Sequence, residues 1–200
     1  MAGPYEIVAR DGEHRRTKGG SERDMYTAWQ LAQAGEAEQA LKIINAYAQT
    51  LQGFDGHDAP LCSIQAYWLL RAMIILKDSQ TPEWTAMIER AMLPMMAKFE
   101  ADSPYANGNW GHIVNRLRMA CGIFLGDSVL YRHAIDTYLH ANDNGSLPNY
   151  IGETGQCQET GRDQAHAQLG LGAMCEICEM AWEQGDDLYG ALDNRLMKGL

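Results

Sequence analysis

Apolar residues recur at intervals of three and four positions along almost the whole chain. This spacing matches one face of an α-helix, and no stretch alternates apolar and polar residues for long enough to predict a sheet. The pattern therefore predicts an all-α fold. Helices are expected over residues 21–34, 36–51, 60–77, 81–101, 110–125, 127–142 and 161–184, with a kink near Pro94 and an eighth helix from about Asp187.

The links between these helices alternate in length. Short turns join the first helix to the second, the third to the fourth, the fifth to the sixth and the seventh to the eighth, and longer loops join the other pairs. Short links produce antiparallel hairpins, so the longer loops all fall at one end of the assembly. We expect antiparallel helical hairpins forming a partial (α/α) toroid over residues 21–200, incomplete at its C-terminus, with an N-terminal arm or lid at residues 1–20.

Composition narrows the classes of function. The net charge of −10 leaves no basic surface for nucleic acid. No apolar run is long enough to span a membrane, and the first 18 residues lack the apolar core of a secretion signal. The chain has five cysteines, an odd number that does not suggest a disulfide framework. Cys175 and Cys178 have CxxC spacing but lie among apolar residues, which favours packing over a redox or metal pair.

Polar and aromatic residues gather in the three longer loops. These loops are GFDGHDA, DSPYANGN and NDNGSLPNYIGETGQCQET. The short turns at the other end contain little except Gly, Asp and Ser. A cleft for sugar or peptide is built in this way, with function on loops that a rigid frame holds.

The start of the seventh helix is unusually rich in ionisable groups. Glu159, Arg162, Asp163 and His166 are spaced by three and four, so on a continuous helix they share one face. One interpretation is a capping network at the helix N-terminus, which leaves His166 without a role. A metal site is a second interpretation, although no further strong ligand pair is near in sequence. A catalytic or binding site is the third.

The second group is NGNWG, residues 107–111. Gly108 and Gly111 permit unusual backbone angles around Asn109, and Trp110 offers a flat face that can stack on a sugar ring. The structural alternative is that Asn109 caps the fifth helix and Trp110 packs beneath the loop. His112, three residues after Asn109, is placed to orient it or to contact the substrate.

These residues resemble a known family. NGNWG, followed about fifty residues later by QETGRDQAHAQLGLG and then by EICEMAWEQGDDLYGALDNRLMKG, is similar to the alginate lyase superfamily of polysaccharide lyases, in the branch that cleaves mannuronate or glucuronate polymers. The resemblance covers most of the chain from about Asp24. It implies an (α/α) toroid, a periplasmic or secreted location, further helices after residue 200, and cleavage of an anionic polysaccharide by β-elimination with neither metal nor cofactor.

The implied chemistry assigns tasks to side chains. Elimination removes the C5 proton beside the sugar carboxylate and expels the oxygen on C4. The carboxylate must therefore be neutralised by hydrogen-bond donors that bind it more strongly as it becomes an enolate. Asn109 with Arg162 or His166 is expected to do this, and His166 is also the first choice for the base. Members of the family usually carry a catalytic tyrosine. Tyr150 lies in a suitable loop and Tyr189 lies beyond the seventh helix, but neither matches the motif.

Further residues are expected to bind the substrate. They are His57, Asp58, Trp110, His112, Tyr150 and Glu159. Two other functions stay open at this point. One is a glycoside hydrolase that uses two of Asp58, Glu159 and Asp163 as acid and base. The other is a carbohydrate-binding or helical-repeat scaffold without catalysis. The sequence does not predict the oligomeric state.

Overall fold

The structure is a computed structural model that describes residues 5–9, 21–56, 58–102 and 108–200. These residues are mainly helical, which confirms the all-α fold. The chain divides into two compact units, Met1–Phe99 and Glu100–Leu200. The partial toroid, and the division of the chain at residue 20, stay predictions.

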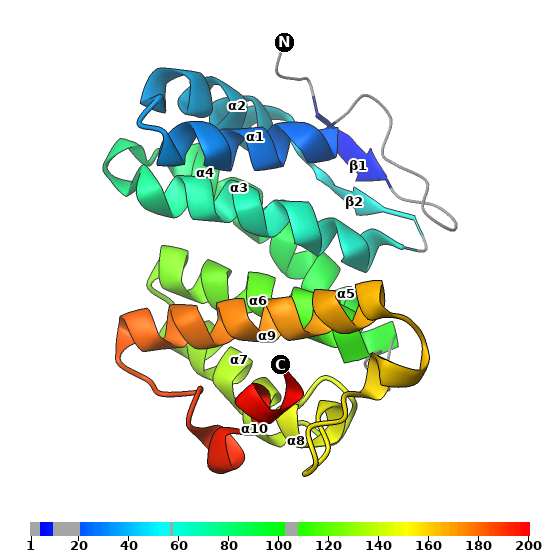
Figure 1. Ribbon diagram of the computed structural model, residues 1–200. Helices are drawn as coiled ribbons and strands as arrows, with labels where there is room; N and C mark the ends of the chain where they lie inside the picture. Colours follow the sequence, from blue (N-terminus) through cyan, green and yellow to red (C-terminus); the bar gives the residue numbers. More distant parts are fainter. Residues whose placement is uncertain (1–4, 10–20, 57, 103–107) are drawn as a thin grey trace. The chain divides into compact units, whose positions relative to one another are not determined.

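Unit 1 is built from antiparallel helices. The helices α1 (Ser21–Gln33) and α2 (Ala37–Thr50) form a hairpin, α1 also packs on α3 (Ser63–Ile75), and α2 packs on α4 (Pro82–Met87) (Figure 1). The turn between α1 and α2 contains Gly35, whose φ of +79° is easy only for glycine. The core of the unit includes Met25, Ala28, Ile44, Tyr47, Leu69, Leu70 and Met73.

A short parallel pair of strands in unit 1 was not expected from the sequence. β1 (Ile7–Ala9) pairs with β2 (Gly53–Asp55). Val8 is buried, and the ring of Tyr5 stacks on that of Tyr47 with centroids 3.9 Å apart. Strands of three residues are too short to show an alternation with a period of two, so no sequence pattern predicts them. Residues 5–9 of the expected arm therefore pack against unit 1.

The predicted kink near Pro94 takes the form of a change in helix type. α4 passes into a π-helical turn, η4 (Ile88–Met92), and then into α5 (Leu93–Asp102). Proline has no N–H to bond the carbonyl four residues earlier, and its ring clashes with that carbonyl. A π turn widens the helix at this point, which relieves the clash.

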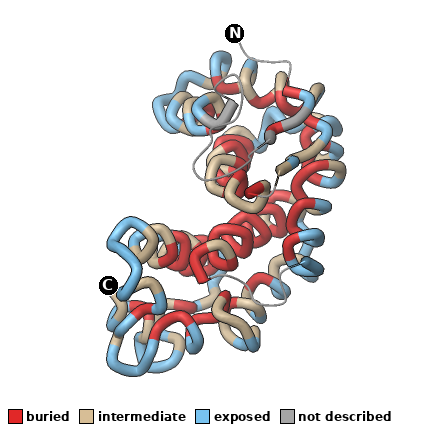
Figure 2. Tube along the Cα trace, turned by 90° about the vertical axis from the view of Figure 1, so that its right-hand side faces the viewer, coloured by how far each residue is buried: buried red, intermediate tan, exposed pale blue. Residues whose placement is uncertain are grey.

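Unit 2 is organised around one buried helix. α6 (Gly108–Leu125) packs on α7 (Ser128–His140) and on α9 (Gln164–Gln184). Almost every residue of α6 is buried (Figure 2). Asp127 caps α7 by accepting hydrogen bonds from the amides of Val129 and Leu130 at 2.9 and 3.0 Å. Gly122 lets α7 approach, because a Cβ there would lie 2.7 Å from the backbone nitrogen of Tyr131.

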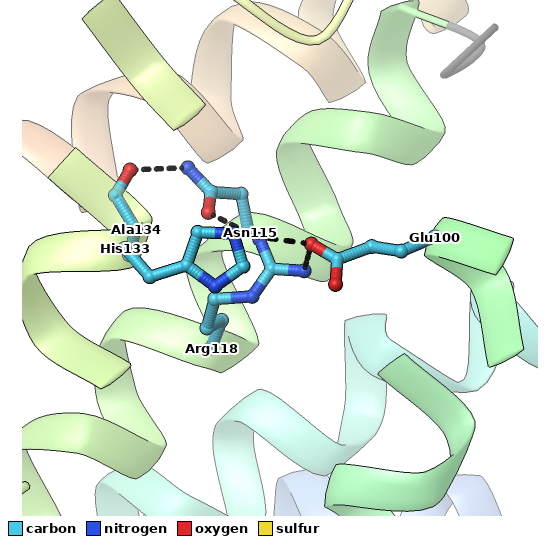
Figure 3. A network of polar contacts seen from close by, with 5 residues as sticks. All are labelled: Glu100, Asn115, Arg118, His133 and Ala134. Atoms are coloured by element: carbon cyan, nitrogen blue, oxygen red, sulfur yellow. Dashed lines mark hydrogen bonds and ion pairs between the residues drawn. The ribbon is translucent and has the colours of Figure 1, made fainter. Parts of the chain in front are cut away.

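Polar residues in the middle of α6 are paired. Arg118 donates to Glu100 and, at 2.9 Å, to Asn115 Oδ1, while Asn115 Nδ2 donates to the carbonyl of Ala134 at 2.9 Å (Figure 3). His133 lies 3.5 Å from the same carboxylate of Glu100. Arg116, two residues before Arg118, pairs with Glu176 of α9. These bonds compensate the burial of two arginines inside the unit.

The last part of the chain departs from the predicted helices. The long loop after α7 contains a short helix, α8 (Leu147–Tyr150), and the 3-10 turn η5 (Gln158–Gly161). α9 begins at Gln164, three residues later than expected. In α10 (Ala191–Gly199), Leu192, Asp193 and Asn194 have left-handed backbone angles, so regular helix follows only after them. Within the described ranges, no helix has the length and apolarity needed to cross a membrane.

Candidate active site

A pocket of about 280 Å³ lies in unit 2, where the N-terminus of α6 meets η5. It is lined by Gly108, Asn109, Trp110, Gln158, Glu159 and Arg162. The lining thus comes from two segments about fifty residues apart, which are the two groups that the sequence singled out. Of the nine predicted site residues, Asn109, Trp110, Glu159 and Arg162 are brought together here.

Asn109 is the most unusual member of this lining. Its side chain is 1% exposed, and its Nδ2 has no hydrogen-bond partner among the described residues. It lies inside the first turn of α6, so the alternative in which Asn109 is the cap residue before the helix is wrong. A buried amide without a partner costs about 1–3 kcal/mol. Asn109 is also one of the residues that line the pocket.

Gly108 allows the two segments to meet. A Cβ at this position would lie 2.5 Å from Gln158 Oε1 and 2.8 Å from a ring carbon of Tyr150. The sequence attributed Gly108 and Gly111 to unusual backbone angles, but both are helical, and neither is among the glycines with positive φ. Close approach is therefore the reason for Gly108. Gln158 belongs to the last of the three longer loops, and nothing in the sequence marks this contact.

The predicted helical face of ionisable groups does not exist. Glu159 is in the 3-10 turn η5, and Asp163, with φ −170° and ψ 162°, is extended. The backbone between Glu159 and His166 is therefore not a continuous helix, and the four residues do not stack over two helical turns. Gly161 and the capping preference of aspartate explain why the helix starts late. The carboxylate of Glu159 lies 3.7 Å from the guanidinium of Arg162, so the two form an ion pair in the pocket wall.

Asp163 is the N-cap of α9 and holds His166. Its carboxylate accepts a bond from the backbone amide of His166 at 2.9 Å and lies 2.6 Å from His166 Nδ1. These bonds lower the pKa of Asp163 from its ordinary value, first through the backbone amide and then through the ring. The capping interpretation is thus correct for Asp163, and it also involves His166. The ring is partly exposed, in the first turn of α9 and four residues beyond Arg162, but it does not line the pocket.

His112 and Tyr150 form a buried pair behind the pocket. Their rings meet edge to face with centroids 4.5 Å apart. His112 is fully buried, and burial lowers its pKa to about 3, so the ring is neutral. Burial is the largest cause of a raised pKa for Tyr150, and the nearby Cys157 and Glu159 raise this pKa further. Within the described part of the chain, neither the ring nitrogens of His112 nor the hydroxyl of Tyr150 has a hydrogen-bond partner.

Gly170 of α9 accommodates this pair. A Cβ at Gly170 would lie 1.9 Å from the hydroxyl oxygen of Tyr150. Tyr150 therefore packs against α9 instead of entering the pocket. The hydroxyl of Tyr189, the second candidate tyrosine, donates to Glu179 at 3.0 Å, and burial raises the pKa of Tyr189. Neither tyrosine lines the pocket.

The remaining predicted residues lie elsewhere. His57 is outside the described residues, and Asp58 is 8% exposed in unit 1. Cys178 is buried 3.3 Å from the hydroxyl of Tyr138, and its burial raises its pKa to about 12. The described residues contain no group of three or more His, Cys, Asp or Glu side chains that could hold a metal ion.

Comparison with known proteins identifies the family of the chain. The family model described as alginate lyase matches residues 9–200. No curated protein matches the chain. Because the match spans both units and both pocket segments, the chain belongs to the alginate lyase family.

Proposed function

We propose that this protein cleaves a uronic acid polymer, such as polymannuronate or glucuronan, by β-elimination, and that the pocket at the start of α6 receives the carboxylate of the sugar. Membership of the alginate lyase family supports a polysaccharide lyase that acts on an anionic polysaccharide. The observation that carries the proposal is that Asn109, with an amide unpaired among the described residues, and Arg162 line one pocket.

The pocket suits a carboxylate for three reasons. Arg162 supplies a positive charge, and Asn109 supplies a neutral donor. Gly108, Asn109 and Trp110 form the first turn of an 18-residue helix, whose N-terminal amides carry a partial positive charge. Donors arranged in this way bind the developing enolate more strongly than the ground-state carboxylate, which lowers the barrier to removing the C5 proton.

The carboxylate of Glu159 partly offsets the positive charge of Arg162. Its carboxylate lies 3.7 Å from Arg162 and is 12% exposed, whereas the side chain of Arg162 is 57% exposed. The ion pair holds Arg162 at the pocket and leaves much of the guanidinium open to a ligand. Carboxylate oxygens of Glu159 can also accept hydrogen bonds from sugar hydroxyls. Trp110 completes the lining with a flat surface on which a sugar ring can stack.

His166 is the proposed general base. The short contact from Nδ1 to Asp163 favours the tautomer in which Nδ1 carries the proton, so Nε2 keeps a lone pair. Nε2 takes the C5 proton, the C–H electron pair forms the C4–C5 double bond, and the C4–O bond breaks. The protonated ring can then deliver its proton to the leaving oxygen when both lie on the same face of the sugar. His166 thereby serves both steps, and the neutral Tyr150 and Tyr189 are not required as the base.

The hydrolase alternative is less well supported. A hydrolase needs one carboxylic acid with a raised pKa to protonate the leaving group. Asp163 is instead stabilised in its ionised form by two bonds to His166. Glu159 is engaged with Arg162, and Asp58 belongs to unit 1. Asp163 is therefore not suited to be the acid of a hydrolase. The ion pairs of Asp163 and Glu159 agree better with a lyase than with a hydrolase.

Product analysis tests the proposal. The protein is incubated with polymannuronate, polyguluronate and glucuronan, and the near-ultraviolet absorbance of unsaturated products is recorded. We expect absorbance to rise with at least one polymer, and to rise far more slowly for Asn109→Ala and His166→Ala. His140→Ala is the matched control, because His140 is an exposed histidine at the end of α7. New reducing ends without absorbance would identify a hydrolase, and no turnover at all would indicate a scaffold.

A further inference from the structure

Unit 1 carries three adjacent aromatic side chains at its surface, which we name the aromatic platform: Tyr26 and Trp29 of α1, and Trp68 of α3. The ring centroids of Trp29 and Trp68 are 4.4 Å apart, and the ring of Tyr26 lies 5.4 Å from Trp29 and 5.5 Å from Trp68. The helices that carry them pack side by side in unit 1 (Figure 1). None of the three lines the pocket of unit 2.

The platform is not simply part of the core. Tyr26 is 39% exposed, and Trp29 and Trp68 are each partly exposed. By contrast, Trp84 in the same unit is fully buried and its indole nitrogen donates to Asn45 at 2.7 Å. Three large rings that share one exposed face keep an apolar surface in contact with water, and such surfaces commonly mark a binding site. Flat aromatic faces of this size suit the C–H faces of sugar rings.

Charges beside the platform favour an acidic sugar. Arg23 precedes Tyr26 by three positions on α1, and Arg71 follows Trp68 by three positions on α3, so each arginine shares a helix face with a platform ring. The chain as a whole has a net charge of −10. Arg23 and Arg71 therefore place positively charged side chains close to the rings. The neighbouring carboxylate of Asp24 accepts a hydrogen bond from the hydroxyl of Tyr5.

An unused acceptor lies on the same helix. Gln65 precedes Trp68 by three positions, and its Oε1 is buried without a hydrogen-bond partner in the described ranges. A sugar hydroxyl can supply the missing donor. Rings, arginines and an unpaired amide oxygen together form the set of groups that recognises a carboxylated sugar.

We infer that the aromatic platform is a binding site for uronate residues of the polysaccharide, carried by unit 1 and additional to the pocket of unit 2. The inference rests on the proposed function for the identity of the polymer. The platform holds the chain without taking part in the chemistry, so its contribution is to affinity. The sequence pattern gave no sign of it, because the three rings come from helices that resemble ordinary amphipathic segments.

Affinity electrophoresis tests this site without requiring turnover. All proteins carry His166→Ala to suppress cleavage, and their migration is compared in native gels that contain polymannuronate, glucuronan or a neutral glucan. Trp68→Leu removes the flat ring but keeps an apolar side chain between α1 and α3, and Tyr26→Ala removes the most exposed ring. Trp182→Ala is the matched control, since Trp182 is 60% exposed in unit 2. Circular dichroism establishes that each variant is folded.

We expect Trp68→Leu to weaken retention by the acidic polymers about five- to tenfold, and Tyr26→Ala about threefold. Trp182→Ala should migrate like the parent, and Trp68→Phe should recover part of the loss. If Trp68→Leu does not fold, Tyr26→Ala decides. Unchanged retention of the platform variants, or an equal loss for Trp182→Ala, overturns the inference. Platform-dependent retention in a protein without lyase activity would overturn the proposed function alone.

Discussion

Two turns of the same helix show how differently buried polar residues can be used. In the first turn of α6, Asn109 and His112 are almost completely buried and have side-chain nitrogens without partners among the described residues. One and two turns later, Asn115 and Arg118 are equally buried, but they bond to each other, to Glu100 and to the carbonyl of Ala134 (Figure 3). Burial and polarity alone therefore do not identify a site. The proposed site rests on an unpaired donor that also lines a pocket.

The difference has an energetic meaning. A satisfied buried network can be neutral or stabilising for the fold, whereas an unpaired buried donor lowers stability by about 1–3 kcal/mol. We propose that the unpaired donor of Asn109, at a pocket, is kept for a ligand. We therefore expect substitution of Asn109 to affect activity and substitutions in the middle of α6 to affect stability.

The largest expected effect is on turnover. Asn109→Ala should lower kcat/KM by about 10²–10³-fold, which is the usual loss when one donor to a developing oxyanion is removed. Its thermal unfolding temperature should not fall, because no bond within the described residues is lost. Asn115→Ala is the reciprocal variant and should lower the unfolding temperature instead. Equal losses of stability in both variants would erase the contrast between the two turns.

The second effect is on stability. Glu100→Ala leaves the guanidinium of Arg118 buried without its carboxylate, and we expect the free energy of unfolding to fall by about 3 kcal/mol. The value is at the lower end for broken buried pairs, because Glu100 is 43% exposed. Urea unfolding measures it. Glu38→Ala removes an exposed pair with Lys42 and should leave the midpoint unchanged. A Glu100 variant as stable as the parent would show that the network is not structural.

The third effect concerns pH. Burial holds the pKa of His112 at about 3, against 6.5 for an exposed histidine. Between these values the unfolded chain binds the extra proton, so the free energy of unfolding decreases as the pH falls, by up to about 1.4 kcal/mol per pH unit. His112→Phe should show a shallower dependence between about pH 6 and 4. Identical slopes for the parent and the variant would indicate that His112 is protonated in the folded state.

The smallest effect is at the edge of the pocket. Trp110→Ala should raise KM about three- to tenfold with a smaller change in kcat, because the indole provides stacking surface and no proton. Trp182→Ala serves as the control for loss of an exposed tryptophan. A fall in kcat at unchanged KM would assign Trp110 a part in the chemistry.

Much of the fold followed from the sequence because its signals are local. The helix boundaries at Gly35 and Asp127 depend on a left-handed glycine and on a capping carboxylate, and both are visible in a few residues. The strands β1 and β2 were missed because their pairing joins residues far apart in the chain. The start of α9 was misplaced because Glu159, Arg162 and Asp163 satisfy a helical spacing that the backbone does not adopt.

The lining of the candidate site was predicted in part for the same reason. Asn109, Trp110, Glu159 and Arg162 belong to two short motifs, and the structure brings them into one pocket. The role of Gly108 depends on a contact with Gln158 and Tyr150, which only the folded chain brings about. The burial of His112 and Tyr150 depends on Gly170, in a third segment. The aromatic platform likewise needs α1 and α3 side by side.

The most direct measurement follows the side-chain amide of Asn109 by NMR. The His166→Ala protein, labelled with ¹⁵N, is titrated with a uronate oligosaccharide, and the asparagine side-chain resonances are assigned with Asn109→Ala and Asn115→Ala. The account predicts that the Asn109 resonance moves as the carboxylate binds and that the Asn115 resonance stays in place. Saturable binding that leaves the Asn109 resonance unmoved would contradict the account.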